Sequence, residues 1–223
     1  MNINEFLVKR FHVSKEEAGK WISENRVFIN HQKAVQRNTV LKTDVIELNG
    51  EILQEGLTHC YYAYYKPRGI ECTLNPNIAD NLLNVLPFKE YLYPIGRLDK
   101  ESEGLLILTN DGKLYKDIAH AEKGKEKEYV VEVDKELTDA AIEQLAAGIV
   151  IMGKKTRPAV VHRLSSTSFN ITLTQGLNRQ IRRMCHKLGY EVSSLKRIRI
   201  TSILLGDLKP GEYLQIQKKM FDK

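Results

Sequence analysis

The chain has 223 residues, of which 42% are hydrophobic and 28% are charged, a balance that excludes a disordered protein. No segment of the sequence approaches the length needed to span a membrane. Its N-terminal stretch lacks the apolar core of a signal peptide, and its three widely spaced cysteines (Cys60, Cys72 and Cys185) form no CxxC pair. We therefore expect a cytoplasmic protein without disulfides or a zinc site, and its net charge of +6 favours a polyanionic partner.

The first expected element is a helix from Ser14 to about Glu24, because an S-x-x-E capping box precedes an apolar stripe. Short alternating strands are predicted in the stretches RVFIN (26–30) and VIELNG (45–50). A helix followed by small strands makes a compact α/β module, which the pattern places at residues 1–58. This module holds eight Lys/Arg and eight Asp/Glu residues, so it is neutral.

The remaining residues, 59–223, predict an α+β domain with a mixed, mostly antiparallel sheet, since alternating strands outnumber helices. The run GLLILT (104–109) is apolar without alternation, which is typical of a fully buried strand. Asp111 follows it as the predicted N-cap of a helix over GKLYKDIAH. The other expected elements are an aromatic strand over CYYAYYK, a short helix or turn at NLLNVLP, the strand KEYVVEV with Lys127, Tyr129, Val131 and Val133 on one face, a helix over TDAAIEQLAAG, a hairpin of AVVHRL and FNITLT, a helix over NRQIRRMCHKLG, a strand over LKRIRI and a last strand near the C-terminus.

The basic charge of the chain is concentrated in residues 175–199, which hold seven Lys/Arg residues and a single acid, Glu191. Most of them fall in the predicted helix, for which Asn178 is the expected N-cap. At helical spacing one face holds Arg179, Arg182, Arg183 and His186, and the opposite, core-facing stripe holds Ile181, Met184, Cys185 and Leu188. Like charges on consecutive turns repel by a few tenths of a kcal/mol per pair, so we expect an anionic partner such as RNA phosphate rather than a solvated basic face.

Three stretches, GRLDKESEGLLILTNDG, KEYVVEV and GLNRQIRRM, together resemble the signature motifs of the RsuA-type bacterial RNA pseudouridine synthases, and YKPRG matches a further element. The resemblance covers nearly the whole chain, and the N-terminal module resembles an S4-type RNA-binding domain. The run QGLNRQIRRMC followed by LGYEV resembles the RluF subgroup, whose members act on large-subunit ribosomal RNA and, in some cases, a tRNA anticodon loop. The N-terminal stretches SKEEA and INHQ depart from the S4 pattern and imply a weaker grip on RNA.

The resemblance implies that the chain isomerises a uridine in RNA to pseudouridine, which requires cutting the N1 glycosidic bond, turning the uracil and making a bond to C5. The resemblance implies three catalytic residues. Asp99 is the essential aspartate, Tyr129 stacks on the flipped base, and Arg182 forms an ion pair with Asp99. An Asp, with a reference pKa of ~3.9, is ionised near neutral pH, as a base or nucleophile must be. For Asp99, attack at C1′ of the ribose, attack at C6 of the base and deprotonation at C2′ all stay open. For Tyr129, the strand pattern alone fits a residue of the hydrophobic core equally well.

The implied partner is RNA, either ribosomal RNA or tRNA, with no cofactor, no metal, no membrane and no obligate protein partner, and the protein is expected to be a monomer. Leu195 matches an aliphatic residue that packs on the other side of the base, and Arg97 serves either the chemistry or the positioning of RNA. The residues expected to bind RNA are Arg97, Lys127, Arg179, Arg183, Leu195, Lys196 and Arg197.

Two other functions fit parts of the sequence. A glycosidase would use Asp99 with Glu101 or Glu103 as a carboxylate pair, but it would have no need of the arginine-rich helix. A non-catalytic S4-type ribosome-associated protein would explain the charge, but it would leave Asp99 and Tyr129 without a role. Release of tritium from C5-labelled uridine in RNA distinguishes the three functions.

Overall fold

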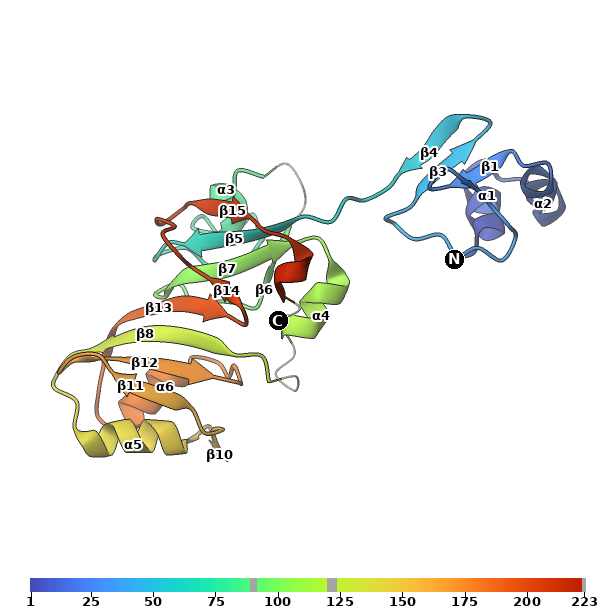
Figure 1. The fold of residues 1–223 in the computed structure, drawn as a ribbon. Coiled ribbons are helices and arrows are strands. Elements are labelled where there is room, and N and C mark those ends of the chain that lie inside the picture. The colour runs from blue at the N-terminus through green and yellow to red at the C-terminus, as the bar shows by residue number, and fades with distance from the viewer. Residues whose placement is uncertain (89–91, 120–123, 222–223) are drawn as a thin grey trace. The chain divides into compact units, whose positions relative to one another are not determined.

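The computed structural model describes residues 1–88, 92–119 and 124–221, and these fall into two compact units, Met1–His59 and Cys60–Lys223 (Figure 1). The boundary predicted from the sequence lies one residue earlier. Each unit has a hydrophobic core of its own. Within the described ranges, no helix is both long enough and apolar enough to cross a lipid bilayer.

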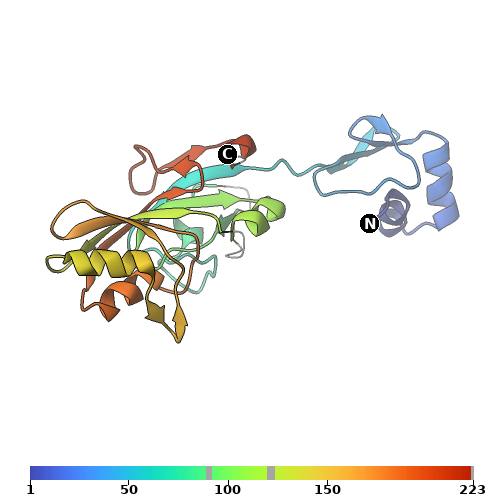
Figure 2. The same cartoon turned by 60° about the horizontal axis from the view of Figure 1, so that its bottom comes forward.

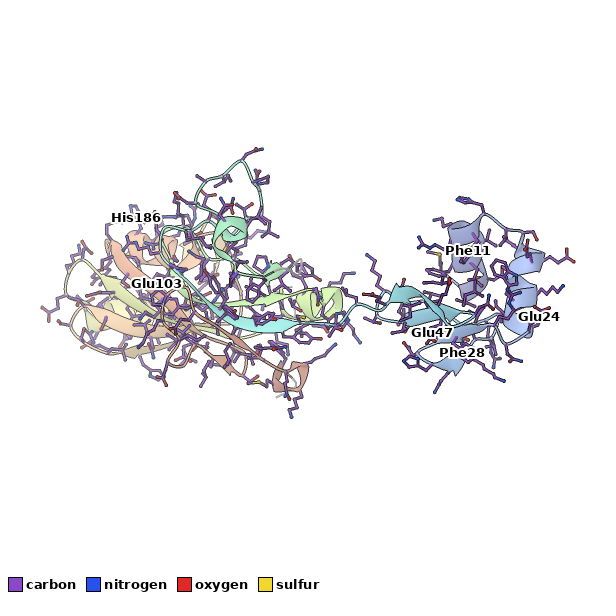
Figure 3. All side chains as sticks on the ribbon, turned by 90° about the horizontal axis from the view of Figure 1, so that it is seen from above. Phe11, Glu24, Phe28, Glu47, Glu103 and His186 are labelled. Carbon is purple, nitrogen blue, oxygen red and sulfur yellow. The ribbon has the colours of Figure 1, made fainter. Side chains whose placement is uncertain are left out.

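The N-terminal unit packs two helices against a small antiparallel sheet. Its elements are α1 (Ile3–Phe11), α2 (Lys15–Ser23), β1 (Val27–Ile29), β2 (Gln32–Lys33), β3 (Val45–Leu48) and β4 (Glu51–Glu55). The strands pair in the order β2-β1-β3-β4. Phe11, labelled in Figure 3, lies at the end of α1. It contacts Trp21 of α2 edge to face, with 5.4 Å between the ring centroids, and this contact joins the two helices.

The helix expected from Ser14 is α2. Ser14 Oγ accepts a hydrogen bond from the amide of Glu17 at 3.1 Å, which is the serine half of the predicted capping box. The helix α1 was missing from the prediction, although it carries the same kind of signal. Asn2 and Glu5 form reciprocal capping bonds of 2.8 and 3.2 Å there, so a full capping box starts α1 rather than α2.

The larger unit is built on one mixed sheet with helices on its faces. Its elements are β5 (Tyr61–Lys66), α3 (Leu82–Val85), β6 (Tyr93–Ile95), β7 (Glu103–Thr109), α4 (Gly112–Ala119), β8 (Lys127–Val133), α5 (Asp139–Ala147), β9 (Val150–Ile151), β10 (Lys154–Lys155), β11 (Val160–Arg163), β12 (Ser168–Leu173), α6 (Gln180–Lys187), β13 (Val192–Ile200), β14 (Ile203–Leu204), β15 (Tyr213–Gln215) and the 3-10 helix η2 (Lys218–Phe221). Among the described residues, nine strands join in the order β11-β12-β8-β13-β7-β5-β15, with β14 beside β13 and β6 beside β7 (Figure 1). The pairing of β13 with β7 is parallel and the other neighbours in this order are antiparallel, which confirms the predicted α+β domain.

β7 is the strand predicted from the run GLLILT, and both of its faces are covered. Leu105 and Ile107 belong to a core that includes side chains of α4. Leu106 and Leu108 belong to a second core, which includes Leu82 of α3. A strand with two buried faces favours apolar side chains at successive positions, and this explains why the run does not alternate.

α4 begins where the sequence predicts. Asp111 Oδ1 accepts hydrogen bonds from the amides of Lys113 and Leu114, at 2.9 and 3.2 Å, and so caps the first turn of the helix. His120, the predicted last residue of this helix, lies outside the described residues.

α5 and α6 cover the same face of β8, β12 and β13 (Figure 2). Ile181, Met184 and Cys185 of α6 are buried in this core, as the predicted apolar stripe requires. His186 lies on the exposed side of α6 and projects from the surface of the unit (Figure 3), where its Nε2 is 3.6 Å from a carboxylate oxygen of Glu191.

The start of α6 differs from the prediction of Asn178 as N-cap. The helix begins at Gln180, and the N-cap residue is Arg179, with a φ of +50°. Gln180 is buried, its side chain accepts from the amide of Leu177 at 3.0 Å, and its own amide donates to the Leu177 carbonyl at 3.1 Å. These two bonds close a turn ahead of the helix. Asn178 instead accepts from the guanidinium of Arg183, and Arg179 leaves the helix face on which it was predicted.

Candidate active site

A cleft of about 660 Å³ lies where β13 pairs with β7 and β8, a size typical of ligand sites. Its walls come from the loop ahead of β7, from α4, from β8 and β13, and from the turn that leads into α6. The cleft brings together seven residues to which the sequence gave a role on RNA: Arg97, Asp99, Lys127, Tyr129, Arg179, Leu195 and Arg197. Three others, Arg182, Arg183 and Lys196, lie outside this lining.

The loop that carries Asp99 is held on several sides. The buried Leu98 donates its amide to Cys72 Sγ at 3.3 Å. Ser102 donates its amide to the carbonyl of Asp99 at 3.0 Å, and Gly69 donates to the carbonyl of Lys100 at 2.8 Å. The Asp99 side chain remains 30% exposed, so a carboxylate open to the cleft stands on a rigid support.

The ion-pair partner of Asp99 is Arg179, whose Nη1 lies 3.8 Å from Asp99 Oδ2. The prediction gave this contact to Arg182. It is wrong for this structure because α6 starts at Gln180, which leaves Arg179 outside the helix and able to reach the cleft. The Arg179 side chain is 45% exposed, so the pair is open to solvent and weak.

Arg182 lies in the first turn of α6 and binds the loop behind Asp99. Its guanidinium donates to the carbonyl of Val192 at 2.9 Å, to the carbonyl of Glu101 at 3.0 Å and to Ser102 Oγ at 3.4 Å. Burial and the nearby charge of Arg179 lower the pKa of Arg182, whereas the charge of Asp99 raises it. Arg182 is therefore in the electrostatic field of Asp99, but its hydrogen bonds hold the polypeptide around the carboxylate.

Tyr129 and Leu195 lie on the same face of the sheet, at the cleft. The register of β8 and β13 sets Leu195 opposite Val131 and Arg197 opposite Tyr129, so Tyr129 and Leu195 are diagonal neighbours on adjacent strands. Lys127 lines the cleft two residues before Tyr129. Burial, followed by the charge of Arg197, lowers the pKa of the Lys127 amine. An aromatic ring, an aliphatic side chain and a cation thus share one wall.

Three residues predicted to bind RNA are engaged in contacts within the protein. Arg197 is 1% exposed, because alternation along β13 turns it inward together with Leu195, so the prediction of a surface contact with RNA is wrong. Lys196 occupies the opposite face, with its Nζ 5.9 Å from the ring centroid of Tyr65. Arg183 is exposed on α6, but its guanidinium bonds back to Asn178 and it does not line the cleft.

Two further residues, one that lines the cleft and one buried within the electrostatic reach of Asp99, had no predicted role. Tyr115 of α4 is 38% exposed, lines the cleft and meets Tyr93 edge to face at 5.6 Å; a tyrosine in an amphipathic helix gave no signal in the sequence. Lys66 is fully buried at the end of β5, and its Nζ donates to the carbonyls of Pro67 and Ile70, both at 2.7 Å. Burial lowers the pKa of Lys66. Its signals in the sequence were its place at the end of an aromatic strand and within the stretch YKPRG.

Neither of the two glutamates that a glycosidase was expected to pair with Asp99, Glu101 and Glu103, lines the cleft. Glu101 is half exposed and lies 3.4 Å from the guanidinium of Arg68, and it does not line the cleft. Glu103 is outside the lining too, beside Tyr65. Burial, followed by the charge and the hydrogen bond of Glu103, raises the pKa of Tyr65 to about 12. In residues 1–88, 92–119 and 124–221, no group of three or more His, Cys, Asp or Glu side chains is arranged to hold a metal ion.

The cleft combines the partly exposed carboxylate of Asp99 with several cations and the aromatic ring of Tyr129. This combination suits a polyanionic substrate such as RNA, from which one base is flipped out of its stacked position. The fold and the cleft together define an RNA-modifying enzyme. Comparison with known proteins gives the family: residues 60–187 match the family model described as RNA pseudouridylate synthase, and the chain belongs to this family. It is an isomerase that forms pseudouridine in RNA.

The relatives place the chain among the RsuA-type enzymes. It is 39% identical over 213 residues to the dual-specificity RNA pseudouridine synthase RluF of Salmonella typhi, and the aligned region covers 95% of this chain and 74% of the relative. It is 31% identical over 221 residues to the ribosomal small subunit pseudouridine synthase A of Escherichia coli (strain K12), which covers 96% and 95%. A crystal structure of a pseudouridylate synthase matches with a TM-score of 0.70 and 26% identity over 100% of this chain and 99% of that one. The identity is thus higher to RluF than to the small-subunit enzyme.

Proposed function

We propose that this enzyme converts one specific uridine of a structured RNA to pseudouridine, with 23S ribosomal RNA as its substrate and a tRNA anticodon loop as a second candidate. The similarity to RluF, which is named as a dual-specificity RNA enzyme, supports a pair of RNA substrates. In this proposal the enzyme acts as a monomer.

The position of Asp99 carries the proposal. Its carboxylate lines the cleft, on a loop that hydrogen bonds hold from both sides, and a cation lies 3.8 Å away. A carboxylate so placed is suited to act on the ribose or the base of one nucleotide as nucleophile or base. Attack at C1′, attack at C6 and removal of the C2′ proton all start from the ionised form.

Tyr129 and Leu195 are proposed to receive the flipped base. Both lie at the cleft, on the same face of adjacent strands, so a planar ring that enters there meets an aromatic side chain and an aliphatic one. Arg97 is exposed and Lys127 half-buried, and both line the cleft, so we assign them to the phosphates that flank the base. Arg182 is assigned to the chemistry through its hold on the loop behind Asp99.

We assign residues 1–59 an auxiliary role as an S4-type RNA-binding module. Two helices on a small antiparallel sheet suit such a module, and its neutral charge suits a minor share of the affinity. The salt dependence of RNA binding by the full chain is then expected to follow the basic residues of the catalytic unit.

The proposal is tested by release of tritium from C5-labelled uridine in 23S ribosomal RNA and in tRNA, measured separately. Pseudouridine formation releases tritium and keeps the base attached to the RNA. A glycosidase would liberate free uracil, and a non-catalytic RNA-binding protein would bind both RNAs without release. Release from neither RNA would contradict the proposed substrates, and pseudouridine mapping in a strain that lacks the gene would then identify the substrate.

A further inference from the structure

Arg197 is the largest side chain buried below 2% exposure among the described residues. Arginine is almost never fully buried unless it is paired, because its guanidinium keeps its charge in any environment. Its position in the middle of the sheet therefore needs an explanation, which neither the predicted RNA contact nor a general role in the core provides.

The guanidinium of Arg197 joins the central strand to the catalytic loop. Its Nε donates to the carbonyl of Leu105 on β7 at 2.7 Å. Its Nη1 donates to the carbonyl of Arg97 at 3.4 Å, and Arg97 lies two residues before Asp99. One side chain thus holds both the strand that supports the loop and the loop itself.

The backbone of Arg197 is fixed between two other parts of the site. It pairs with Tyr129 of β8 on one side and with Gly104 of β7 on the other. A Cβ at Gly104 would lie 2.7 Å from the amide nitrogen of Arg197, so only glycine permits this approach of the two strands. Arg197 therefore connects the tyrosine strand, the central strand and the loop of Asp99.

The third nitrogen of the guanidinium is not used to stabilise the fold. Nη2 is buried and has no hydrogen-bond partner among the described residues, although Arg197 lines the cleft. Buried donors are normally paired, and an unpaired one opposes folding. The unpaired Nη2 therefore adds nothing to stability, and the contribution of the guanidinium to the fold lies in its two bonds to the carbonyls of Leu105 and Arg97.

We propose that Arg197 is a positioning residue, which sets the turn from Arg97 to Asp99 at a fixed distance from Tyr129 so that the carboxylate meets the flipped uridine without readjustment. This inference rests on the proposed function. A displacement of about 1 Å at a reacting group costs on the order of 10²-fold in rate. Loss of the two bonds from Arg197 to the carbonyls of Leu105 and Arg97 is therefore expected to lower the rate measurably.

The test compares Arg197→Gln and Arg197→Lys with the matched control Arg199→Gln. Arg199 lies on the same strand and bonds Glu128 at 2.7 Å and Glu126 at 2.9 Å, outside the cleft lining. Two quantities are measured for each variant of the full chain: hydrogen exchange of the peptide spanning residues 96–102, and single-turnover tritium release alongside RNA affinity.

Arg197→Gln should speed exchange in residues 96–102 and lower the rate of release on the order of 10²-fold, with RNA affinity unchanged. Arg197→Lys keeps the charge and a donor. Its rate of loop exchange and its rate of tritium release should both lie between those of Arg197→Gln and wild type. Arg199→Gln should leave loop exchange and rate unchanged. Unaltered loop exchange, an unaltered rate, a loss confined to RNA affinity, or failure of both Arg197 variants to fold would overturn the proposal. An inactive wild type would instead refute the proposed function, and the exchange measurement would still decide the role of Arg197.

Discussion

Arg179 and Asp99 form an ion pair of 3.8 Å that links the residue before α6 to the loop before β7. Both side chains are partly exposed, so the pair contributes little to stability. A cation held loosely at the mouth of a cleft can exchange its carboxylate partner for an RNA phosphate at small cost. The contact therefore suits a role of Arg179 in binding RNA.

Arg179→Ala should weaken RNA binding and reduce the slope of log K against log salt by about one. Affinities measured at several salt concentrations check this. Lys187→Ala, an exposed change at the far end of α6, is the control and should alter the slope less. If Arg179→Ala left the slope unchanged, Arg179 would make no contact with RNA phosphate, and its only ion-pair partner among the described residues would be Asp99.

Tyr129→Ala should lower kcat/KM for pseudouridine formation by about 10- to 100-fold, because stacking of a base on an aromatic ring contributes ~1–3 kcal/mol. Tyr129→Phe keeps the ring and should keep the RNA affinity, so it separates stacking from any part the hydroxyl has in removing the C5 proton. If Tyr129→Ala lowered stability but left kcat/KM intact, Tyr129 would be a core residue only.

Asp111 joins η2 to the rest of the unit, and this contact depends on pH. Its Oδ2 accepts from the Tyr61 hydroxyl and from Lys218 Nζ, both at 2.8 Å. Burial raises the pKa of the carboxyl, but the hydrogen bonds from Lys218, Tyr61 and the amides that start α4 outweigh burial and bring the pKa of Asp111 well below its ordinary value. A carboxyl whose pKa falls on folding stabilises the fold above its unfolded pKa of ~3.9, and this stabilisation is lost as the pH falls through the folded pKa.

Asp111→Asn should therefore lower the free energy of unfolding at pH 7 by about 1–3 kcal/mol. The difference from wild type should shrink below about pH 4, where the unfolded chain already binds the proton. Urea unfolding at pH 7 and pH 3 measures both values, with the exposed Asp207→Asn as the control. An equal difference at the two pH values would show that the charge of Asp111 has no part in the effect.

Gly104→Ala should be among the most damaging single changes to the sheet. Gly104 has a φ of +104°, and an added Cβ would meet the backbone of Arg197. We expect a loss of at least about 3 kcal/mol, from backbone strain and overpacking together. Gly206→Ala, at a φ of +59° with open space around it, should cost only the strain of about 1 kcal/mol. Urea unfolding compares the two variants, and equal losses would mean that the close approach of β13 does not matter.

The sequence predicted the elements whose signals are local. The unbroken run of β7, the cap at Asp111 and the apolar stripe of α6 each follow from neighbouring residues, and all three are present. The start of α6 was missed because Asn178 is a favoured N-cap residue by type, whereas Arg179 occupies the cap position without a side-chain cap bond. The actual start depends on the burial and hydrogen bonds of Gln180, which are properties of the folded chain.

The sequence also misjudged the basic residues of β13. Counting charge treated Lys196 and Arg197 alike, although a strand sends neighbouring side chains to opposite faces. Which face is buried depends on the pairing of β13 with β7 and β8, and residues far apart in the chain set that pairing. For the same reason no local pattern distinguished Arg179 from Arg182 as the partner of Asp99.

The central claim is that the carboxylate of Asp99 performs the chemistry in this cleft. It is tested most directly by single-turnover tritium release from C5-labelled 23S ribosomal RNA with Asp99→Asn. The control is Asp80→Asn, whose carboxylate pairs with Lys100 but does not itself line the cleft. Asp99→Asn should bind the RNA as wild type does and release no tritium, while Asp80→Asn should release it at close to the wild-type rate. Turnover retained by Asp99→Asn would contradict the account.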